Sequence, residues 1–445
     1  MTEILRQAVE MLLQLLLSPF NQGFWEFILK FIPYVVFFEL PIYLLIFAGI
    51  VRYVLRRYWR APLRRPYRPM VSCLITCYAE GRDVACTIRS LTEQLYEGAI
   101  DIIAVVDGAA RNTATLETAL SLTDMVNARP DRHLTVLPKW QRGGRVSALN
   151  AGLNMAKGSV VMALDGDTSF DNTMVASAVR HFVDPNVIGV AGCLRVRNAG
   201  RSIVTRLQAI EYMLSIHASK VGLSEFNIVN NISGAFGVFR ASFLRAIGGW
   251  DSGTAEDLDI TLRMKNYFGR HSNLRIRFEP EAVGHTDAPD TWRGFLQQRL
   301  RWDGDLFYLY VRKHSLSFAP GIMGWRNLIM QLWTGMFFQL VMPFVILAYT
   351  LYVMLFYPPA WMLSVWALVY LFYLAVTLVF FIMYIVFLSE RPGPDLKLAV
   401  WLPLVPVFTF ITRIWCGVAT LNEWLLRSHL DSSMAPWWVL RKTKY

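Results

Sequence analysis

The sequence has little of what marks several common classes of protein. Charged side chains make up only 17% of the 445 residues, where a soluble domain has about 25%, so the composition disfavours a single water-soluble core. Its 5 cysteines are few and odd in number, and no Cys or His cluster has zinc-ligand spacing, which argues against a disulfide framework and a structural zinc site. No short repeat occurs and 54% of the residues are hydrophobic, so disorder, collagen and coiled coil are excluded.

Two nucleotide-binding signatures are also missing. No Gly-x-x-x-x-Gly-Lys loop is present, which excludes a P-loop enzyme, and no Gly-x-Gly-x-x-Gly follows the first predicted strand, which weakens a dinucleotide site. The net charge of +11 is compatible with a nucleic acid, an anionic membrane face or an anionic substrate as the partner. The position of the charges in the chain has to decide among these three.

Hydrophobic residues are concentrated near the two ends of the chain. Residues 329–357 and residues 361–388 carry no charge, and each run exceeds the roughly 20 apolar residues that a membrane-spanning helix needs. The short Pro-Pro-Ala segment between them is typical of a tight turn. The two runs therefore predict a helical hairpin across a bilayer.

Three further segments carry weaker membrane signals. Residues 31–51 are long enough to span, and we expect their carboxylate, Glu39, to face a packed interface rather than to mark a functional site. Residues 398–421 contain two prolines and Arg413, so they span, kink, or enter the membrane and return. Residues 3–17 mix charges with leucines, which predicts an amphipathic helix at the membrane surface.

Arginines gather directly after the first predicted span. By the positive-inside rule this cluster lies in the cytoplasm, so the segment between the spans is cytoplasmic as well. A nucleic-acid site is the weaker interpretation, because the cluster adjoins a membrane span. The cluster comprises Arg52, Arg56, Arg57, Arg60, Arg64, Arg65 and Arg68.

The segment between the spans has the pattern of an α/β domain, in which short apolar runs alternate with helical stretches. Continuous apolar strands are typical of a parallel sheet that is covered on both faces. In such open sheets, ligands bind beyond the carboxyl ends of the strands. The predicted strands are residues 71–77, 101–106, 133–138 and 159–164.

Two of these strands end directly in acidic residues. Asp107 follows one strand, and a plain Asp-Gly turn and a functional site are equally good interpretations of it. Asp165 and Asp167 flank a glycine after another strand, which permits a close approach of the backbone. Because Mg²⁺ is often held by one or two carboxylates together with substrate phosphates, this second pair predicts a cation and phosphate site.

Two later segments combine charge with helical spacing. Residues 254–259 bring three acids to the start of a predicted helix, where acids either favour the first turn or take a proton from a substrate. Further on, Gln298, Arg301 and Trp302 share one helix face by their spacing. That face belongs either to an amphipathic interfacial helix or to a site for a diphosphate and a sugar.

In this order, inside a membrane-flanked insert, the four motifs resemble the processive family 2 glycosyltransferases. These include the synthases of cellulose, chitin, hyaluronan and poly-N-acetylglucosamine. The resemblance covers about residues 70–430 and implies an α/β GT-A (Rossmann-like) cytoplasmic domain inserted between transmembrane α-helices. The implied division is residues 1–69 for the first membrane segment, 70–315 for the GT-A domain and 316–445 for the C-terminal membrane segments.

The resemblance also implies a role for each matching residue. Asp257 would be the catalytic base, with Glu256 beside it, and Asp165 and Asp167 would bind Mg²⁺ or Mn²⁺. The residues that would bind the donor are Tyr78, Glu80, Asp107, Arg145, Asp165, Gln298, Arg301 and Trp302. The residues that would bind the acceptor are Ser233, Gly234, Ala235, Phe236, Gly237 and Trp302.

The implied function is inverting, metal-dependent synthesis of a β-linked polysaccharide at a bacterial inner (plasma) membrane, with export of the product. The implied partners are a UDP-sugar (UDP-N-acetylglucosamine before UDP-glucose), the growing glycan, the lipid bilayer and a small accessory membrane subunit, and no nucleic acid. The chain departs from the family where Thr76, Ala79 and Arg145 replace the usual Pro, Asn and Lys, which leaves the sugar open. Two alternatives stay open: a non-processive transferase that acts on a membrane lipid, and a non-enzymatic export subunit.

Overall fold

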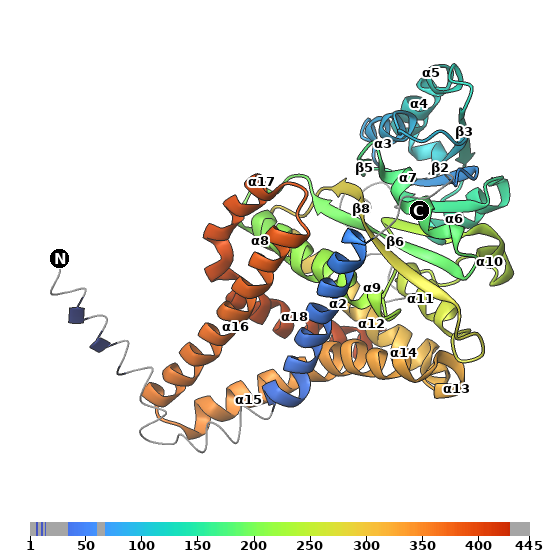
Figure 1. Ribbon diagram of the computed structural model, residues 1–445. Coiled ribbons are helices and arrows are strands. Elements are labelled where there is room, and N and C mark those ends of the chain that lie inside the picture. Colours follow the sequence, from blue (N-terminus) through green and yellow to red (C-terminus); the bar gives the residue numbers. More distant parts are fainter. Residues whose placement is uncertain (1–5, 8–9, 12–13, 15–33, 60–66, 428–445) are drawn as a thin grey trace.

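The computed structural model describes residues 6–7, 10–11, 14, 34–59 and 67–427. The predicted amphipathic helix over residues 3–17 lies mostly outside these residues, as do Arg60, Arg64 and Arg65 of the arginine cluster. Figure 1 shows an α/β domain from which long helices extend to one side. The predicted fold class, an α/β domain combined with long apolar helices, is confirmed.

Within the described residues, the α/β domain is built on an 8-stranded sheet in the order β3-β2-β1-β4-β7-β6-β8-β5. The half formed by β3, β2, β1 and β4 is parallel, and β7 runs antiparallel to both β4 and β6. All four predicted strands are confirmed, each within one residue at either end. The strands are β1 Val71–Cys77, β2 Ile100–Asp107, β3 Arg132–Lys139, β4 Val160–Asp165, β5 Ser169–Phe170, β6 Val187–Val196, β7 Phe236–Arg240 and β8 Arg275–Thr286.

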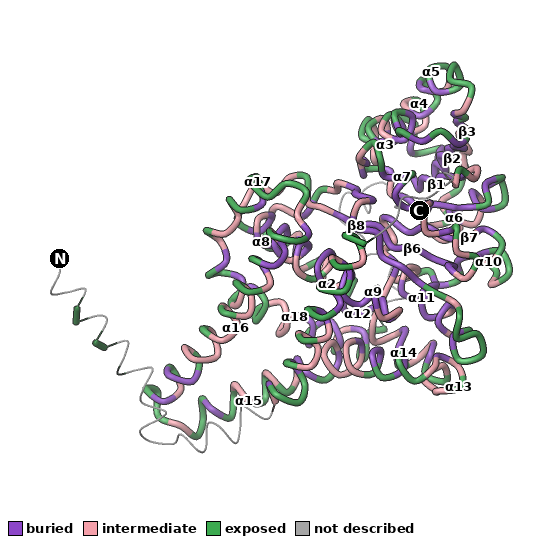
Figure 2. Tube along the Cα trace, viewed as in Figure 1, coloured by how far each residue is buried: buried purple, intermediate pink, exposed green. Residues whose placement is uncertain are grey.

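Side chains alternate between the two faces of the central strands, so each strand contributes to two hydrophobic cores. On β1, Leu74 packs into the core that includes α6, whereas Cys73 and Ile75 pack into the core that includes α3. The strands are buried along most of their length, as Figure 2 shows. Both faces are therefore covered, as the continuous apolar strands predict.

All of the cysteines lie in the described part of the chain and are free thiols.

The helices of the α/β domain connect these strands and close the site described below. The α-helices are α3 Val84–Thr92, α4 Thr113–Ser121, α5 Thr123–Asn127, α6 Gly144–Met155, α7 Met174–Val179, α8 Ile203–Glu211, α9 Ser219–Glu225, α10 Ala241–Ala246, α11 Glu256–Lys265 and α12 Trp292–Phe307. Shorter or wider turns are the 3₁₀-helices η2 Ala109–Arg111, η3 Arg180–Val183 and η6 Ser315–Ser317, and the π-helices η4 Tyr212–Ala218 and η5 Tyr308–Lys313.

In the described part of the chain, 4 helical segments are long and apolar enough to cross a membrane, by length and composition. The uncharged runs form α15 and α16 with a short turn between them, as predicted. The third C-terminal run begins as a 3₁₀-helix with Pro403 inside it and continues as α18. The elements are η1 Val35–Glu39 with α2 Leu40–Tyr58; α13 Pro320–Met323, α14 Trp325–Met330, η7 Gln331–Val341 and α15 Met342–Phe356; α16 Pro359–Phe387; and α17 Pro392–Leu396, η8 Lys397–Leu404 and α18 Val405–Leu426.

The first long helix, α2, packs directly on α9 of the α/β domain. Gly49 and Gly222 meet at this contact, where a Cβ on Gly49 would clash with the Gly222 carbonyl oxygen. Just beyond it, Arg56 Nη1 lies 3.0 Å from the buried carboxylate of Glu225. Close backbone contact and an ion pair therefore fix α2 to the domain that holds the site.

The last long helix, α18, packs against α12, which carries the Gln298–Trp302 motif. Trp415 Nε1 donates a hydrogen bond to the Leu296 carbonyl oxygen at 2.7 Å, and Phe408 stacks near Phe295 with ring centroids 5.0 Å apart. The candidate membrane helices thus form one wall of the space in which this motif lies.

Candidate active site

A cavity of about 2750 Å³ lies at the carboxyl ends of β1, β2 and β4 and continues between the long helices. Most of the predicted site residues line it. They are Tyr78, Glu80, Asp107, Arg145, Asp165, Asp167, Ser233, Gly234, Ala235, Glu256, Asp257, Gln298, Arg301 and Trp302. The other two predicted residues, Phe236 and Gly237, do not line it.

Phe236 and Gly237 lie inside β7, where they pair with β4. The Phe236 ring is buried in the core and meets Phe170 edge-on at 5.2 Å between ring centroids. The loop that reaches the cavity ends at Ala235, because the chain enters the sheet at the next residue. The geometry therefore separates these two residues from a role in direct acceptor contact.

At one end of the cavity, Asp107 organises the loop before α6. Its carboxylate accepts hydrogen bonds from Lys139 Nζ at 2.8 Å, Gly143 N at 2.9 Å and Gly144 N at 2.8 Å. Nearby, the Arg142 guanidinium stacks over the Tyr78 ring at 4.5 Å. Asp107 thus has a structural task of its own, because it positions the start of the helix that carries Arg145.

Three carboxylates converge where β1 and β4 end. Glu80 packs against Gly166, between Asp165 and Asp167, and its Oε2 is buried without a hydrogen-bond partner. Burial, with the charges of Asp167 and Asp165, raises the pKa of Glu80 to about 8. Burial and the Asp165 charge raise the pKa of Asp167 to about 6. The site therefore concentrates negative charge that a bound cation would stabilise.

These carboxylates fit a divalent cation only in part. Oxygen ligands suit Mg²⁺ and Mn²⁺, and the unpartnered Glu80 oxygen adds an acceptor beside the pair of aspartates. Among the described residues, however, no group of three or more His, Cys, Asp or Glu side chains is arranged to hold a metal ion. The residues thus fit a cation that takes its remaining ligands from a bound diphosphate.

Arg145 connects the acidic groups across the cavity. Its guanidinium forms ion pairs with Asp165 and Glu256, donates to Thr76 Oγ1 at 2.9 Å and donates to the Gly234 carbonyl oxygen at 2.6 Å. Burial acts to lower its pKa, but the two carboxylates outweigh burial and raise it, so the guanidinium stays charged. One cation therefore bridges the ends of β1 and β4, the loop before β7 and the start of α11.

Asp257 lies at the first turn of α11 with its side chain in the cavity. Its Oδ2 accepts a hydrogen bond from Gly234 N at 3.1 Å, and its Oδ1 accepts one from Leu258 N at 2.7 Å. Burial and the neighbouring charge of Glu256 raise the pKa of Asp257 to about 6. A carboxylate with a pKa just below neutrality is suited to accept a proton at physiological pH.

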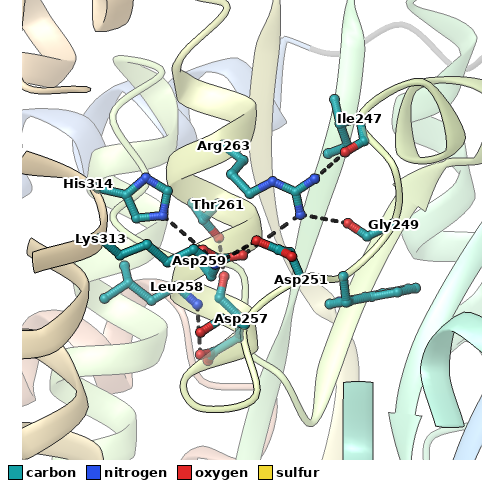
Figure 3. Close-up of polar contacts among 12 residues, drawn as sticks. Ile247, Gly249, Asp251, Asp257, Leu258, Asp259, Thr261, Arg263, Lys313 and His314 are labelled. Atoms are coloured by element: carbon teal, nitrogen blue, oxygen red, sulfur yellow. Dashed lines mark hydrogen bonds and ion pairs between the residues drawn. The ribbon is translucent and has the colours of Figure 1, made fainter. Parts of the chain in front are cut away.

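A buried ion network holds the helix that carries Asp257 (Figure 3). Asp259 Oδ1 lies 2.8 Å from both Lys313 Nζ and His314 Nε2, and Lys313 also lies 2.8 Å from Asp251 Oδ2. Arg263, on the same helix, donates to the Gly249 carbonyl oxygen at 2.7 Å. The network therefore joins α11 to the end of η5 and to the loop before α11.

On α12, Gln298, Arg301 and Trp302 face the cavity as their spacing predicts. Arg299 lines the cavity as well, but it forms an ion pair with Glu211 at 2.5 Å. Its guanidinium also lies 5.3 Å from the Trp302 ring centroid and so contacts the indole. The helix thus presents an amide, a cation and an aromatic ring to one cavity.

Comparison with known proteins agrees with this arrangement. The family model described as glycosyl transferase family group 2 matches residues 160–385, which is about half of the chain. The chain belongs to this family. The match covers the Asp165, Asp257 and Trp302 motifs, whereas Tyr78, Asp107 and Arg145 precede it.

Individual relatives are similar to this glycosyltransferase family member over part of its length. It is 30% identical over 236 residues to the poly-β-1,6-N-acetyl-D-glucosamine synthase of Staphylococcus aureus strain COL, covering 52% of this chain and 53% of the relative. It is also 30% identical over 234 residues to the synthase of the same name from Staphylococcus epidermidis, with the same coverage. The chain thus spans about half the length of the curated relatives it matches.

A solved structure matches the fold of this family member over more of its length. It is the mannosyltransferase PcManGT from Pyrobaculum calidifontis in complex with GDP-Man and Mn²⁺, with a TM-score of 0.53 and 18% sequence identity. The match covers 86% of this chain and 96% of the mannosyltransferase. At this identity the likeness concerns the fold, and it agrees with the predicted GT-A class.

Sequence reasoning missed several residues that this family member places around Asp257. Lys220 of α9 is buried, lines the cavity and has its pKa lowered to about 8 by burial, which Asp257 partly opposes. Asp259, Lys313 and His314 form the network described above. The sequence did contain one signal for this network, the three acids in the first turn of the predicted helix. A single acid is enough to favour a helix start, so the other two suggest a further role.

Proposed function

We propose that this protein is an inverting, metal-dependent membrane glycosyltransferase that builds a β-linked polymer of N-acetylglucosamine from UDP-N-acetylglucosamine. The observation that carries the proposal is the single cavity, which joins Asp165 and Asp257 to Trp302 and then continues between the candidate membrane helices. The similarity to two poly-β-1,6-N-acetyl-D-glucosamine synthases supports this sugar, with UDP-glucose as the next candidate.

The donor would lie along the carboxyl ends of the parallel strands. Tyr78 offers a ring for the base, and Asp107 keeps the following loop in place so that Arg145 reaches the site. Asp165 and Asp167 would hold Mg²⁺ or Mn²⁺ with the diphosphate, and the cation would neutralise the charge of the departing UDP. The mannosyltransferase of similar fold is in complex with Mn²⁺, which supports a divalent cation at this position.

In the transfer step, Asp257 would act as the base. Its carboxylate takes the proton of an acceptor hydroxyl while that oxygen bonds to the anomeric carbon of the donor sugar. The bond from the anomeric carbon to the diphosphate breaks on the opposite face, and Arg301 stabilises the charge that UDP carries away. A single displacement inverts the configuration, so an α-linked donor yields a β-glycoside.

The membrane part of the cavity would guide the product. Glu39 accepts hydrogen bonds from Tyr34 at 2.9 Å and from Tyr373 at 2.7 Å, so it is packed among tyrosines and also lines the cavity. Aromatic faces and hydroxyl groups along this path suit a chain of sugars. We infer a multi-pass protein of a bacterial inner membrane, with the α/β domain in the cytoplasm beside the arginine cluster.

The test is incubation of the purified full chain with a panel of radiolabelled nucleotide sugars and Mg²⁺ or Mn²⁺, followed by sizing of the products. A long polymer from UDP-N-acetylglucosamine alone supports the proposal, and Asp257→Asn should abolish it in a folded protein. A short lipid-linked product would favour the non-processive alternative. Turnover of no donor at all would refute the proposal, and polymer output unchanged by Asp257→Asn would refute the assignment of the base.

A further inference from the structure

The cavity contains buried polar atoms that no described residue satisfies. Asp303, directly after Trp302, is only 7% exposed and lines the cavity, and its Oδ2 has no hydrogen-bond partner. Gln331, at the start of η7, is 1% exposed and lines the same cavity, and its Nε2 has no partner. Because buried polar groups are nearly always hydrogen-bonded, both atoms require an explanation.

The neighbours of Asp303 are already engaged. Arg299 is committed to Glu211 at 2.5 Å, and Arg413 donates to the Phe338 carbonyl oxygen at 2.9 Å. Burial raises the pKa of Asp303 to about 6, against the lowering effect of these two guanidiniums. The Asp303 carboxylate is therefore buried at the cavity wall with one oxygen that has no partner among the described residues.

Gln331 contributes to the same cavity from the start of η7. Its Oε1 is 3.5 Å from the hydroxyl of Tyr310, which also lines the cavity. Its Nε2 has no partner among the described residues, so the NH₂ group remains available to an acceptor. The cavity thus offers an unused acceptor directly after Trp302 and an unused donor at the start of η7.

Together these atoms match a ligand that has both hydrogen-bond donors and acceptors. A sugar unit satisfies this requirement, and an acetamido sugar does so with one substituent, since its N–H donates and its C=O accepts. An apolar lipid tail satisfies neither atom. A bare phosphate has acceptors for Gln331 but is repelled by Asp303.

We propose that Asp303 and Gln331 form a subsite that binds the acceptor glycan where the cavity passes from Trp302 to the candidate membrane helices, and that recognises the amide or hydroxyl groups of its sugar units. The inference rests on the proposed function, because it requires a glycan acceptor. It adds two residues that determine acceptor specificity, and it explains the acidic residue that directly follows Trp302 in this chain.

The test measures initial rates of the full chain in lipid nanodiscs, with UDP-N-acetylglucosamine as the donor. N,N′-diacetylchitobiose, its de-N-acetylated form and cellobiose serve as soluble acceptors. Asp303→Asn replaces a charged acceptor with a neutral amide, and Gln331→Leu removes a donor. Each should therefore raise the KM for the preferred acceptor about tenfold, with a smaller change in the donor KM. The acceptor with the largest effect identifies the substituent that the subsite binds.

The matched control is Asn327→Leu. Asn327 is also buried with an unpartnered side-chain oxygen, but it does not line the cavity, so its acceptor KM should stay at the wild-type value. Equal acceptor KM values for the wild type, Asp303→Asn and Gln331→Leu would overturn the subsite, since water alone would then satisfy both atoms. If one variant fails to fold, the other decides. Failure of the proposed function is separate, because it appears as absence of donor turnover in the wild type.

Discussion

Replacing Asp259 with Asn should both destabilise this protein and slow transfer, because this carboxylate joins α11 to Lys313 and His314 at the end of η5 (Figure 3). Asp259 is fully buried, and its Oδ1 lies 2.8 Å from Lys313 Nζ and 2.8 Å from His314 Nε2. Asn keeps the size of the side chain but removes the negative charge. The helix that carries Asp257 then loses its tie to the segment that follows α12.

The magnitude follows from burial. Removing one partner of a buried ion pair costs about 3–5 kcal/mol. Lys313 keeps its contact with Asp251, and Asp259 Oδ2 has no hydrogen-bond partner, so part of the cost of burying the charge is recovered. We therefore expect a loss of about 2 kcal/mol in the free energy of unfolding, or a fall in Tm of about 4–8 °C for a domain of this size.

Two measurements on the full chain in one detergent test this expectation. Thermal unfolding reports the change in Tm, and initial rates report kcat and the donor KM. Asp259 follows the proposed base, Asp257, by two residues, and its N–H donates to the Ala255 carbonyl oxygen at 3.0 Å, so a loosened helix start should displace Asp257. Since a displacement of about 1 Å can cost about 100-fold in rate, kcat should fall about 10- to 100-fold, and the donor KM should change less.

Asp251→Asn is the matched control, because it removes the other carboxylate that contacts Lys313. The Asp251 side chain is 64% exposed, so its loss should change stability by less than about 1 kcal/mol and leave kcat near the wild-type value. If Asp259→Asn and Asp251→Asn give the same Tm and the same kcat, the network does not position Asp257.

Three further outcomes follow from the geometry. Because burial and Glu256 raise the pKa of Asp257 to about 6, kcat/KM should fall as pH decreases below about 6, which a pH–rate profile measures. Burial raises the pKa of Glu80 from 4.5 to about 8, so between these two pH values the folded protein binds a proton that the unfolded chain does not. Stability should therefore fall as pH rises from 4.5 to about 8, and Glu80→Gln should flatten the curve of Tm against pH over this range. Gly49→Val should cost about 3 kcal/mol, visible as loss of the monodisperse peak in size exclusion, because its side chain meets the Gly222 carbonyl.

The parallel half of the sheet could be predicted because β1, β2 and β4 are largely continuous apolar runs, and β3 alternates apolar residues with polar ones. Strand β8 could not be predicted in this way, since Arg277 and Glu279 interrupt its apolar pattern. In the fold, Glu279 is buried against Arg180 at 2.7 Å and His181 at 2.6 Å, and these partners lie far earlier in the chain. A strand such as β8, whose buried charges pair with distant residues, lacks the local apolar pattern from which a strand is predicted.

The candidate site could also be predicted only where a local sequence pattern marks its residues. Motifs at strand ends and helix starts could be assigned to one cavity, because those ends converge in an open α/β sheet. The family resemblance places Phe236 in a loop beneath the acceptor, but the sheet begins at that residue and buries its ring. For Asp259 the sequence offers a helix-start acid or a proton acceptor, and it does not predict an ion pair, because Lys313 and His314 lie beyond α12 and no spacing connects them to it.

The arginines at the end of the first long helix contribute to the fold. Arg56 Nη1 lies 3.0 Å from Glu225, and Arg57 Nη2 lies 2.9 Å from Glu281, so both have counterions on the α/β domain. The residues from which the orientation is predicted therefore also dock α2 on that domain. The net charge of +11 therefore overstates the positive charge that is available to an anionic partner. An anionic donor would instead meet the cations that line the cavity, such as Arg301.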